Sequence, residues 1–137
     1  MPHVIIADDN KEFRALLATF CLRAGWTVEI CGNGAELMDV VMSGTEPGLL
    51  LIDIMMPVLD GIEAIERICA QDRPLRVRFM SGGDSGPLMA AKLIASARDM
   101  SVGRNIFKPV TRAEILCILE QEAEHLSRLA PCAGKRP

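Results

Sequence analysis

The 137-residue chain lacks the features that mark several classes of protein. No apolar run approaches the roughly 20 residues of a membrane-spanning helix, so we expect no membrane partner. Fifteen basic residues stand against 18 acidic ones, and a net charge of -3 argues against nucleic acid as a partner, because phosphate binding needs clustered lysine and arginine. The N-terminus has no signal-peptide pattern, so we expect a cytoplasmic location.

The cysteines do not have the pattern of a disulfide framework or of a zinc site. No CxxC pair occurs, and neither His3 nor His125 lies at ligand spacing from a cysteine. We expect both histidines on the solvated surface. The cysteine count is odd, and most of these residues fall in apolar patterns, so we interpret them as reduced, buried, structural thiols: Cys21, Cys31, Cys69, Cys117 and Cys132.

Short apolar runs alternate with amphipathic helical patterns along the chain. Continuous apolar runs of this length are typical of parallel strands that are covered on both faces. The alternation therefore predicts one α/β domain with right-handed crossovers over residues 1–129, followed by a loose tail over 130–137. The five predicted strands are Val4–Ala7, Thr27–Cys31, Leu49–Ile52, Val77–Met80 and Asn105–Phe107.

Helix boundaries can be predicted from spacing and from capping residues. Apolar residues from Phe13 to Phe20 follow helical spacing, and Gly25 lies where that helix should end. Two later helices should each begin with a capping box, in which the side chain of each of two residues accepts a hydrogen bond from the backbone N–H of the other. The two pairs with that spacing are Asp60 with Glu63 and Thr111 with Glu114.

Polar side chains directly follow most of the predicted strands. Because parallel strands end at one edge of a sheet, and ligands of open α/β sheets bind at that edge, we expect these groups to converge. Crowded carboxylates repel one another unless a cation neutralises them, and oxygen ligands suit Mg²⁺. The residues are Asp8 and Asp9 after the first strand, Asp53 after the third, Ser81 after the fourth and Lys108 after the fifth.

This set of groups suits phosphoryl transfer, which depends on positioning and on charge neutralisation. A carboxylate can act as a nucleophile and form an aspartyl phosphate. Lys108 offers a positive charge to a phosphoryl oxygen, and Ser81 offers a hydroxyl donor. Asp9 and Asn10 also have a simpler interpretation, since either can cap the first helix.

With these motifs the chain resembles a bacterial two-component response regulator receiver domain of the CheY-like type. The resemblance runs from residue 3 to about 127 and implies a flavodoxin-like (βα)5 fold, a doubly wound parallel sheet in strand order 2-1-3-4-5. The matching segments are Asp8-Asp9-Asn10, the DIMMPVLDG string from Asp53 to Gly61, Met80-Ser81-Gly82 and Phe107-Lys108-Pro109.

The resemblance also implies what the site does. Asp53 would be the phosphoacceptor, with a sensor histidine kinase or a phosphotransfer protein as donor, and Ser81 and Lys108 would contact the phosphoryl group. The domain would be a switch that acts on an unknown downstream protein, not an enzyme beyond its own phosphorylation and slow dephosphorylation. Mg²⁺ or Mn²⁺ would be held by Asp8, Asp9, Asp53 and the backbone carbonyl of Met55.

Several further positions have structural or switching roles in the family. The Lys108–Pro109 bond would be cis, while Pro57 and Gly61 would shape the loop after the phosphoacceptor. Asn105 occupies a switch position where many receivers carry an aromatic residue, and Phe107 should point into the core instead. A homodimer through the face of the fourth and fifth helices is also compatible with the resemblance.

Three alternative functions use the same residues differently. A receiver-like module that is not phosphorylated would only bind partners. A Mg²⁺-dependent phosphohydrolase normally needs a second acid two residues after the nucleophile, and that position is Met55. A flavin-binding module would need a phosphate-cradling loop after the first strand, where Asp8-Asp9-Asn10 carries the opposite charge.

Overall fold

The computed structural model describes residues 2–54, 61–68, 70, 73–82, 85–98 and 100–129, and every structural statement below concerns these residues. Strands and helices alternate along the chain as the sequence predicts. The elements, in chain order, are β1 (His3–Ala7), α1 (Lys11–Arg23), β2 (Thr27–Cys31), α2 (Gly34–Met42), β3 (Gly48–Asp53), α3 (Gly61–Ile68), β4 (Leu75–Ser81), α4 (Ser85–Ala97), β5 (Ser101–Val102), β6 (Ile106–Phe107) and α5 (Arg112–Leu129).

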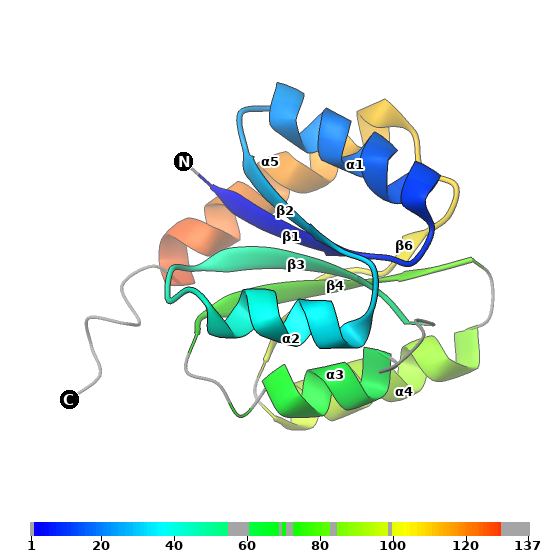
Figure 1. The fold of residues 1–137 in the computed structure, drawn as a ribbon, viewed down its shortest axis with the longest axis vertical. Helices are drawn as coiled ribbons and strands as arrows, with labels where there is room; N and C mark the ends of the chain where they lie inside the picture. The colour runs from blue at the N-terminus through cyan, green and yellow to red at the C-terminus, as the bar shows by residue number, and fades with distance from the viewer. Residues whose placement is uncertain are drawn as a thin grey trace.

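The strands form one parallel sheet between two layers of helices. The strand order is β2-β1-β3-β4-β5, and β6 also pairs with β4. Figure 1 shows α1 and α5 on one face of the sheet and α2, α3 and α4 on the other. The predicted flavodoxin-like fold and the strand order 2-1-3-4-5 are therefore confirmed.

Both faces of the central strands are buried, which explains their continuous apolar runs. Along β3, Leu50 and Ile52 pack with the core residues of α2, α3 and α4, whereas Leu49 and Leu51 pack with those of α1 and α5. Every residue of β3 is buried, Asp53 included. None of the helices in the described part of the chain combines the length and the apolarity that crossing a bilayer demands.

The helix caps agree with the sequence patterns where the structure describes them. Asn10 caps α1, and its side-chain oxygen accepts a hydrogen bond of 3.0 Å from the backbone N–H of Phe13. Thr111 and Glu114 form the predicted capping box through reciprocal bonds of 2.9 and 3.1 Å. The partner of Glu63 in the other predicted box, Asp60, lies outside the described residues.

The predicted fifth strand is in fact two short strands. β5 pairs with β4 at Val77, and β6 pairs with it at Met80, with residues 103–105 between them. Ile106 takes the core position opposite Met80. The next side chain, Phe107, faces away from that core and is 55% exposed, so the prediction that Phe107 points into the core is wrong.

Two predictions about the cysteines and histidines need correction. Cys21 and Cys31 are free and buried as expected, but Cys117 is exposed on α5. His3 is not a solvated surface residue, because β1 pairs with β2 so that His3 lies opposite Thr27. Its ring bonds the Thr27 hydroxyl at 2.6 Å and Glu29 at 2.7 Å, and only 13% of the side chain is exposed.

Candidate functional site

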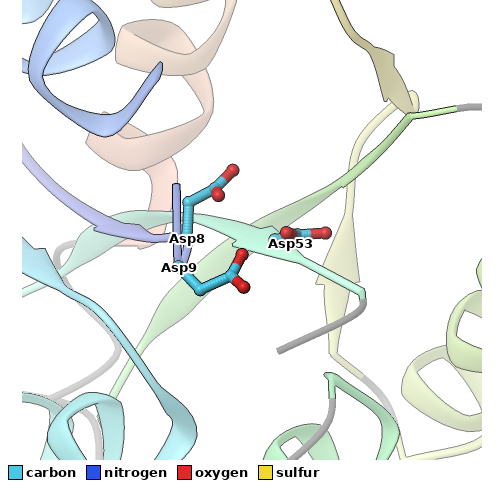
Figure 2. A group of neighbouring side chains, drawn as sticks. All are labelled: Asp8, Asp9 and Asp53. Atoms are coloured by element: carbon cyan, nitrogen blue, oxygen red, sulfur yellow. The ribbon is translucent and has the colours of Figure 1, made fainter. Parts of the chain in front are cut away.

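Asp8, Asp9 and Asp53 lie together at the carboxyl end of the sheet. Each offers one carboxylate oxygen, and these oxygens all lie within 4.8 Å of one another. Figure 2 shows the three side chains at the ends of two neighbouring strands. Asp8 is fully buried and Asp53 is 6% exposed, while Asp9 is open to solvent. The convergence predicted from the strand ends is therefore present in the structure.

The register of β1 against β3 brings the carboxylates of Asp8 and Asp53 together. Ala7 lies opposite Ile52, so the residues that come next in the chain, Asp8 and Asp53, lie at the same level of the sheet. The runs before them, Val4–Ala7 and Leu49–Ile52, are fully buried and fix that register by packing on both faces. The apolar pattern of the strands thus determines where the acidic residues lie.

Asp8 is held in place by backbone and side-chain contacts. Its backbone N–H donates to the carbonyl of Cys31 at 3.1 Å, and its own carbonyl accepts from Nη1 of Arg14 at 3.1 Å. Its carboxylate Oδ1 accepts from the backbone N–H of Asn10 at 2.9 Å. The other oxygen, Oδ2, lies 2.7 Å from Nζ of Lys108. A buried carboxylate is thereby hydrogen-bonded on one oxygen and ion-paired on the other.

Lys108 brings a positive charge to two of the acids. Its Nζ lies 2.7 Å from Asp8 Oδ2 and donates to Asp53 Oδ2 at 3.3 Å. The ring of Phe13 covers the ammonium, with its centroid 4.7 Å from Nζ. Burial by itself lowers the pKa of Lys108, but the hydrogen bond and charge of Asp8, followed by those of Asp53, outweigh burial and raise that pKa above its ordinary value. The side chain is therefore a cation at neutral pH.

The segment that carries Lys108 is attached to the end of β4. The backbone N–H of Lys108 donates to the carbonyl of Ser81 at 2.9 Å, and the following bond to Pro109 is cis, as expected. Ser81 is buried, with 2% exposure. Because Asp53 lies opposite Met80 in the pairing of β3 with β4, Ser81 lies at the same edge of the sheet as the acids.

The remaining predicted site residues are Met55, Pro57, Gly61 and Asn105. Met55 and Pro57 lie outside the described residues, so the predicted metal-ligating carbonyl and the role of the proline stay predictions. Gly61 is the first residue of α3. Asn105 is partly buried, and its Oδ1 atom finds no hydrogen-bond partner among the described residues. Its switching role is likewise a prediction.

Phe13 and Arg14 contact the site although the sequence analysis assigned them no role there. Both lie in the first turn and a half of α1, shortly after the Asp8-Asp9 pair. A helix that begins next to a site directs side chains of its first turns toward it, so their spacing from Asp9 was an available signal. Phe13 touches Lys108, and Arg14 bonds the backbone of Asp8.

The donor set fits a hard divalent cation. All three candidate ligands are carboxylates, and such oxygen atoms are what Mg²⁺ prefers. The exposure of Asp9 gives an ion access from solvent. Lys108 already pairs with Asp8 and Asp53, which shows that these oxygens attract positive charge. Asp8, Asp9 and Asp53 are therefore suited to hold Mg²⁺ or Mn²⁺.

Comparisons with known proteins agree on one family. The family model of the response regulator receiver domain matches residues 4–120. "Response regulator MprA" of Mycobacterium avium is 30% identical over 96 residues, which are 70% of this chain and 42% of that protein. The chain thus spans less than half the length of this curated relative.

Solved structures have the same fold. A response regulator from Colwellia psychrerythraea is 26% identical, with a TM-score of 0.73 over 90% of this chain and 98% of that one. The signal receiver domain of an HD domain-containing protein from Pseudomonas fluorescens is 20% identical, with a TM-score of 0.80 over 93% of this chain and 98% of that one. The latter similarity supports the fold alone.

Proposed function

Because this chain belongs to the response regulator receiver domain family, we propose that Asp53 is a phosphoacceptor whose modification switches the contacts of the domain with other proteins. The observation that carries this proposal is the placement of Lys108, whose ammonium lies between Asp8 and Asp53. A nucleophilic carboxylate beside a fixed cation, with further acids within 4.8 Å, is a set of groups suited to phosphoryl transfer.

The reaction is a substitution at phosphorus. A carboxylate oxygen of Asp53 forms a bond to phosphorus while the bond to the donor breaks, and the electron pair of that bond stays with the leaving group. Lys108 neutralises charge on the phosphoryl oxygens, and the Ser81 hydroxyl donates a hydrogen bond to one of them. Asp8, Asp9 and Asp53 would hold a magnesium ion, with the Met55 carbonyl as the further ligand that the family resemblance implies, and the ion would supply additional charge neutralisation.

The donor would be a phosphohistidine on a sensor kinase or on a phosphotransfer protein, and we expect both proteins to meet in the cytoplasm. On the output side, large apolar side chains are exposed on α4 and β6: Met89 at 65%, Leu93 at 67% and Phe107 at 55%. Met89 and Leu93 are one helical turn apart and share a face of α4. This surface supports a contact with a downstream protein or with a second copy of the domain.

Two other functions would use the same residues. A Mg²⁺-dependent phosphohydrolase would turn over phosphate esters repeatedly, and a module that is not phosphorylated would bind partners without a modification. The buried ion pair of Lys108 with Asp8 favours the phosphoacceptor, because a buried charge without a purpose is costly to keep.

The test is to incubate the protein with Mg²⁺ and acetyl phosphate and to measure its intact mass. We expect one added phosphoryl group, which is absent from Asp53→Asn and from samples treated with EDTA. Repeated release of inorganic phosphate from small esters would instead identify a phosphohydrolase. The absence of any adduct on the wild-type protein would identify the module that is not phosphorylated.

A further inference from the structure

A group of buried charged side chains lies between β4 and α5, outside the acidic site. Glu122 on α5 is fully buried. Its Oε1 accepts a hydrogen bond from Nε of Arg76 at 2.7 Å, and its Oε2 accepts one from Nε of Arg78 at 2.6 Å. Arg76 also donates to the Ser101 hydroxyl at 2.9 Å, and Arg78 donates to Oε1 of Gln121 at 3.1 Å. We call Arg76, Arg78 and Glu122 the arginine clamp.

The clamp is not explained by stability alone. On β4 the residues Val77 and Phe79 belong to the core on the side of α2, α3 and α4, while Met80 belongs to the core on the side of α5. Arg78 thus occupies a position on the α5 side that apolar packing would fill. Replacing a buried ion triad by apolar side chains of similar volume is often neutral or stabilising. The presence of these charges is therefore better explained by a structural role than by a contribution to the folding free energy.

The strand beside the clamp contains one extra residue. Val102 lies opposite Val77 and Ile106 lies opposite Met80, so three residues on this strand face two on β4. An extra residue of this kind is a β-bulge. Val102 packs with the α2, α3 and α4 side of the core, whereas Ile106 packs with the α5 side. Residues four apart on a regular strand face the same side, so the bulge reverses the facing of everything after it.

The clamp forms the seat of this bulge. Gly103, its first residue, is buried, and a Cβ there would lie 2.8 Å from Nε of Arg78 and 3.0 Å from Oε2 of Glu122. Gly103 also donates its N–H to the carbonyl of Val77 at 2.8 Å. The other end of the segment is fixed where Lys108 donates its N–H to Ser81. The segment from Gly103 to Lys108 is therefore attached to β4 at both ends, by the hydrogen bonds to Val77 and Ser81.

We propose that the arginine clamp is a positioning device for Lys108. Arg78 and Glu122 pack against Gly103 and hold the bulge in place. The bulge determines which face of the sheet Ile106 and the residues after it are on, and Lys108 is thereby directed to Asp53. Glu122 acts through Arg78 and Gly103, and its hydrogen bonds go to Arg76 and Arg78 and not to the acids of the site. The inference rests on the proposed function of Asp53, since its consequence is measured as the rate of phosphorylation.

The main test removes all three charges together, because a single removal would leave a buried charge unpaired. In Arg76→Leu/Arg78→Leu/Glu122→Leu we expect a folded protein by circular dichroism and thermal melting. Its Mg²⁺ affinity, measured by calorimetry, should not fall, because the candidate ligands come from β1 and β3; it should stay the same or rise, since a displaced Lys108 competes less for the oxygens of Asp8 and Asp53. The rate of phosphorylation by acetyl phosphate should fall by about tenfold to a hundredfold, the loss that a misplaced group commonly produces. Hydrogen exchange at the Lys108 amide should become faster.

A second variant disturbs the seat without altering any charge. Gly103→Ala places a methyl group against Arg78 and Glu122 and should slow phosphorylation without lowering the Mg²⁺ affinity. Gly48→Ala is the matched control, since its nearest neighbour, Cδ2 of Leu75, lies at an ordinary contact distance of 3.4 Å. This control should phosphorylate at the wild-type rate.

The proposal is overturned if the folded triple variant is phosphorylated as fast as the wild type, or if its Mg²⁺ affinity falls together with the rate. Should the triple variant not fold, the comparison of Gly103→Ala with Gly48→Ala decides, and equal rates overturn the proposal. A wild-type protein that forms no adduct refutes the proposed function instead. In that case exchange at the Lys108 amide still tests the clamp, and an unchanged exchange rate in both variants overturns it.

Discussion

Replacing Lys108 by methionine should destabilise the protein and increase its response to Mg²⁺. The substitution keeps most of the side-chain volume but leaves Asp8, which is fully buried, without the ammonium 2.7 Å from its Oδ2. Breaking a buried ion pair on one side costs about 3–5 kcal/mol. Because the Lys108 side chain is 21% exposed, solvent screens part of that interaction. We therefore expect the free energy of unfolding to fall by an amount at or just below the bottom of this range, about 2–3 kcal/mol.

The response to Mg²⁺ follows from the same contacts. Lys108 occupies oxygens of Asp8 and Asp53 that an ion would use, so its removal eliminates a competitor and leaves three carboxylates within 4.8 Å without their counter-charge. Mg²⁺ should therefore stabilise Lys108→Met more than the wild type. The change Asp9→Asn should act in the opposite direction without metal, because it removes one of the repelling charges.

Urea denaturation gives the measurement, since the chain has a single tryptophan and Trp26 is buried with 5% exposure. Its fluorescence should follow unfolding, and the midpoints with and without Mg²⁺ give the two free energies. Lys92→Met on α4 removes a positive charge away from the acids and serves as the control. Equal midpoints for Lys108→Met and wild type without metal, or equal Mg²⁺ effects on both, would refute the reasoning.

Two further predictions concern parts of the chain around the site. Burial raises the pKa of the thiols of Cys21 and Cys31 to about 12, so at pH 8 only about one part in ten thousand of each is thiolate, the reactive form. Iodoacetamide labelling followed by peptide mass spectrometry should therefore modify the exposed Cys117 before Cys21 and Cys31, and early labelling of Cys21 in the native protein would contradict this. Asn10→Ala removes the cap of α1 and should lower the free energy of unfolding by about 0.5–2 kcal/mol, whereas Asn10→Ser should recover most of it; an unchanged urea midpoint for the alanine variant would show that the cap is not stabilising.

The fold and the acidic part of the site could be predicted because both follow from local pattern. Buried strands appear as continuous apolar runs, and β1 and β3 pair in register, so the residues that follow them must meet. The capping box of Thr111 and Glu114 was predictable for the same reason, since its two members are three residues apart.

The features that the sequence did not reveal depend on contacts between distant segments. His3 was predicted to lie on the surface, but the pairing of β1 with β2 places it against Thr27 and Glu29. The bulge at residues 103–105 could not be predicted from the local sequence, because the side chains that pack against it are Glu122 on α5 and Arg78 on β4. The exposure of Phe107 follows from the bulge, so that error has the same origin.

The acids and the cation of the site therefore have different structural supports. Asp8 and Asp53 directly follow the fully buried runs Val4–Ala7 and Leu49–Ile52, whose register is fixed by packing on both faces. Lys108 directly follows β6, a two-residue strand next to the bulge, at the edge of the sheet. Substitutions in the clamp or the bulge should thus change the position of the positive charge while the carboxylates keep their geometry. Substitutions that remove core volume within Val4–Ala7 or Leu49–Ile52 should instead weaken Mg²⁺ binding and the Lys108 ion pair together, because both depend on these two runs.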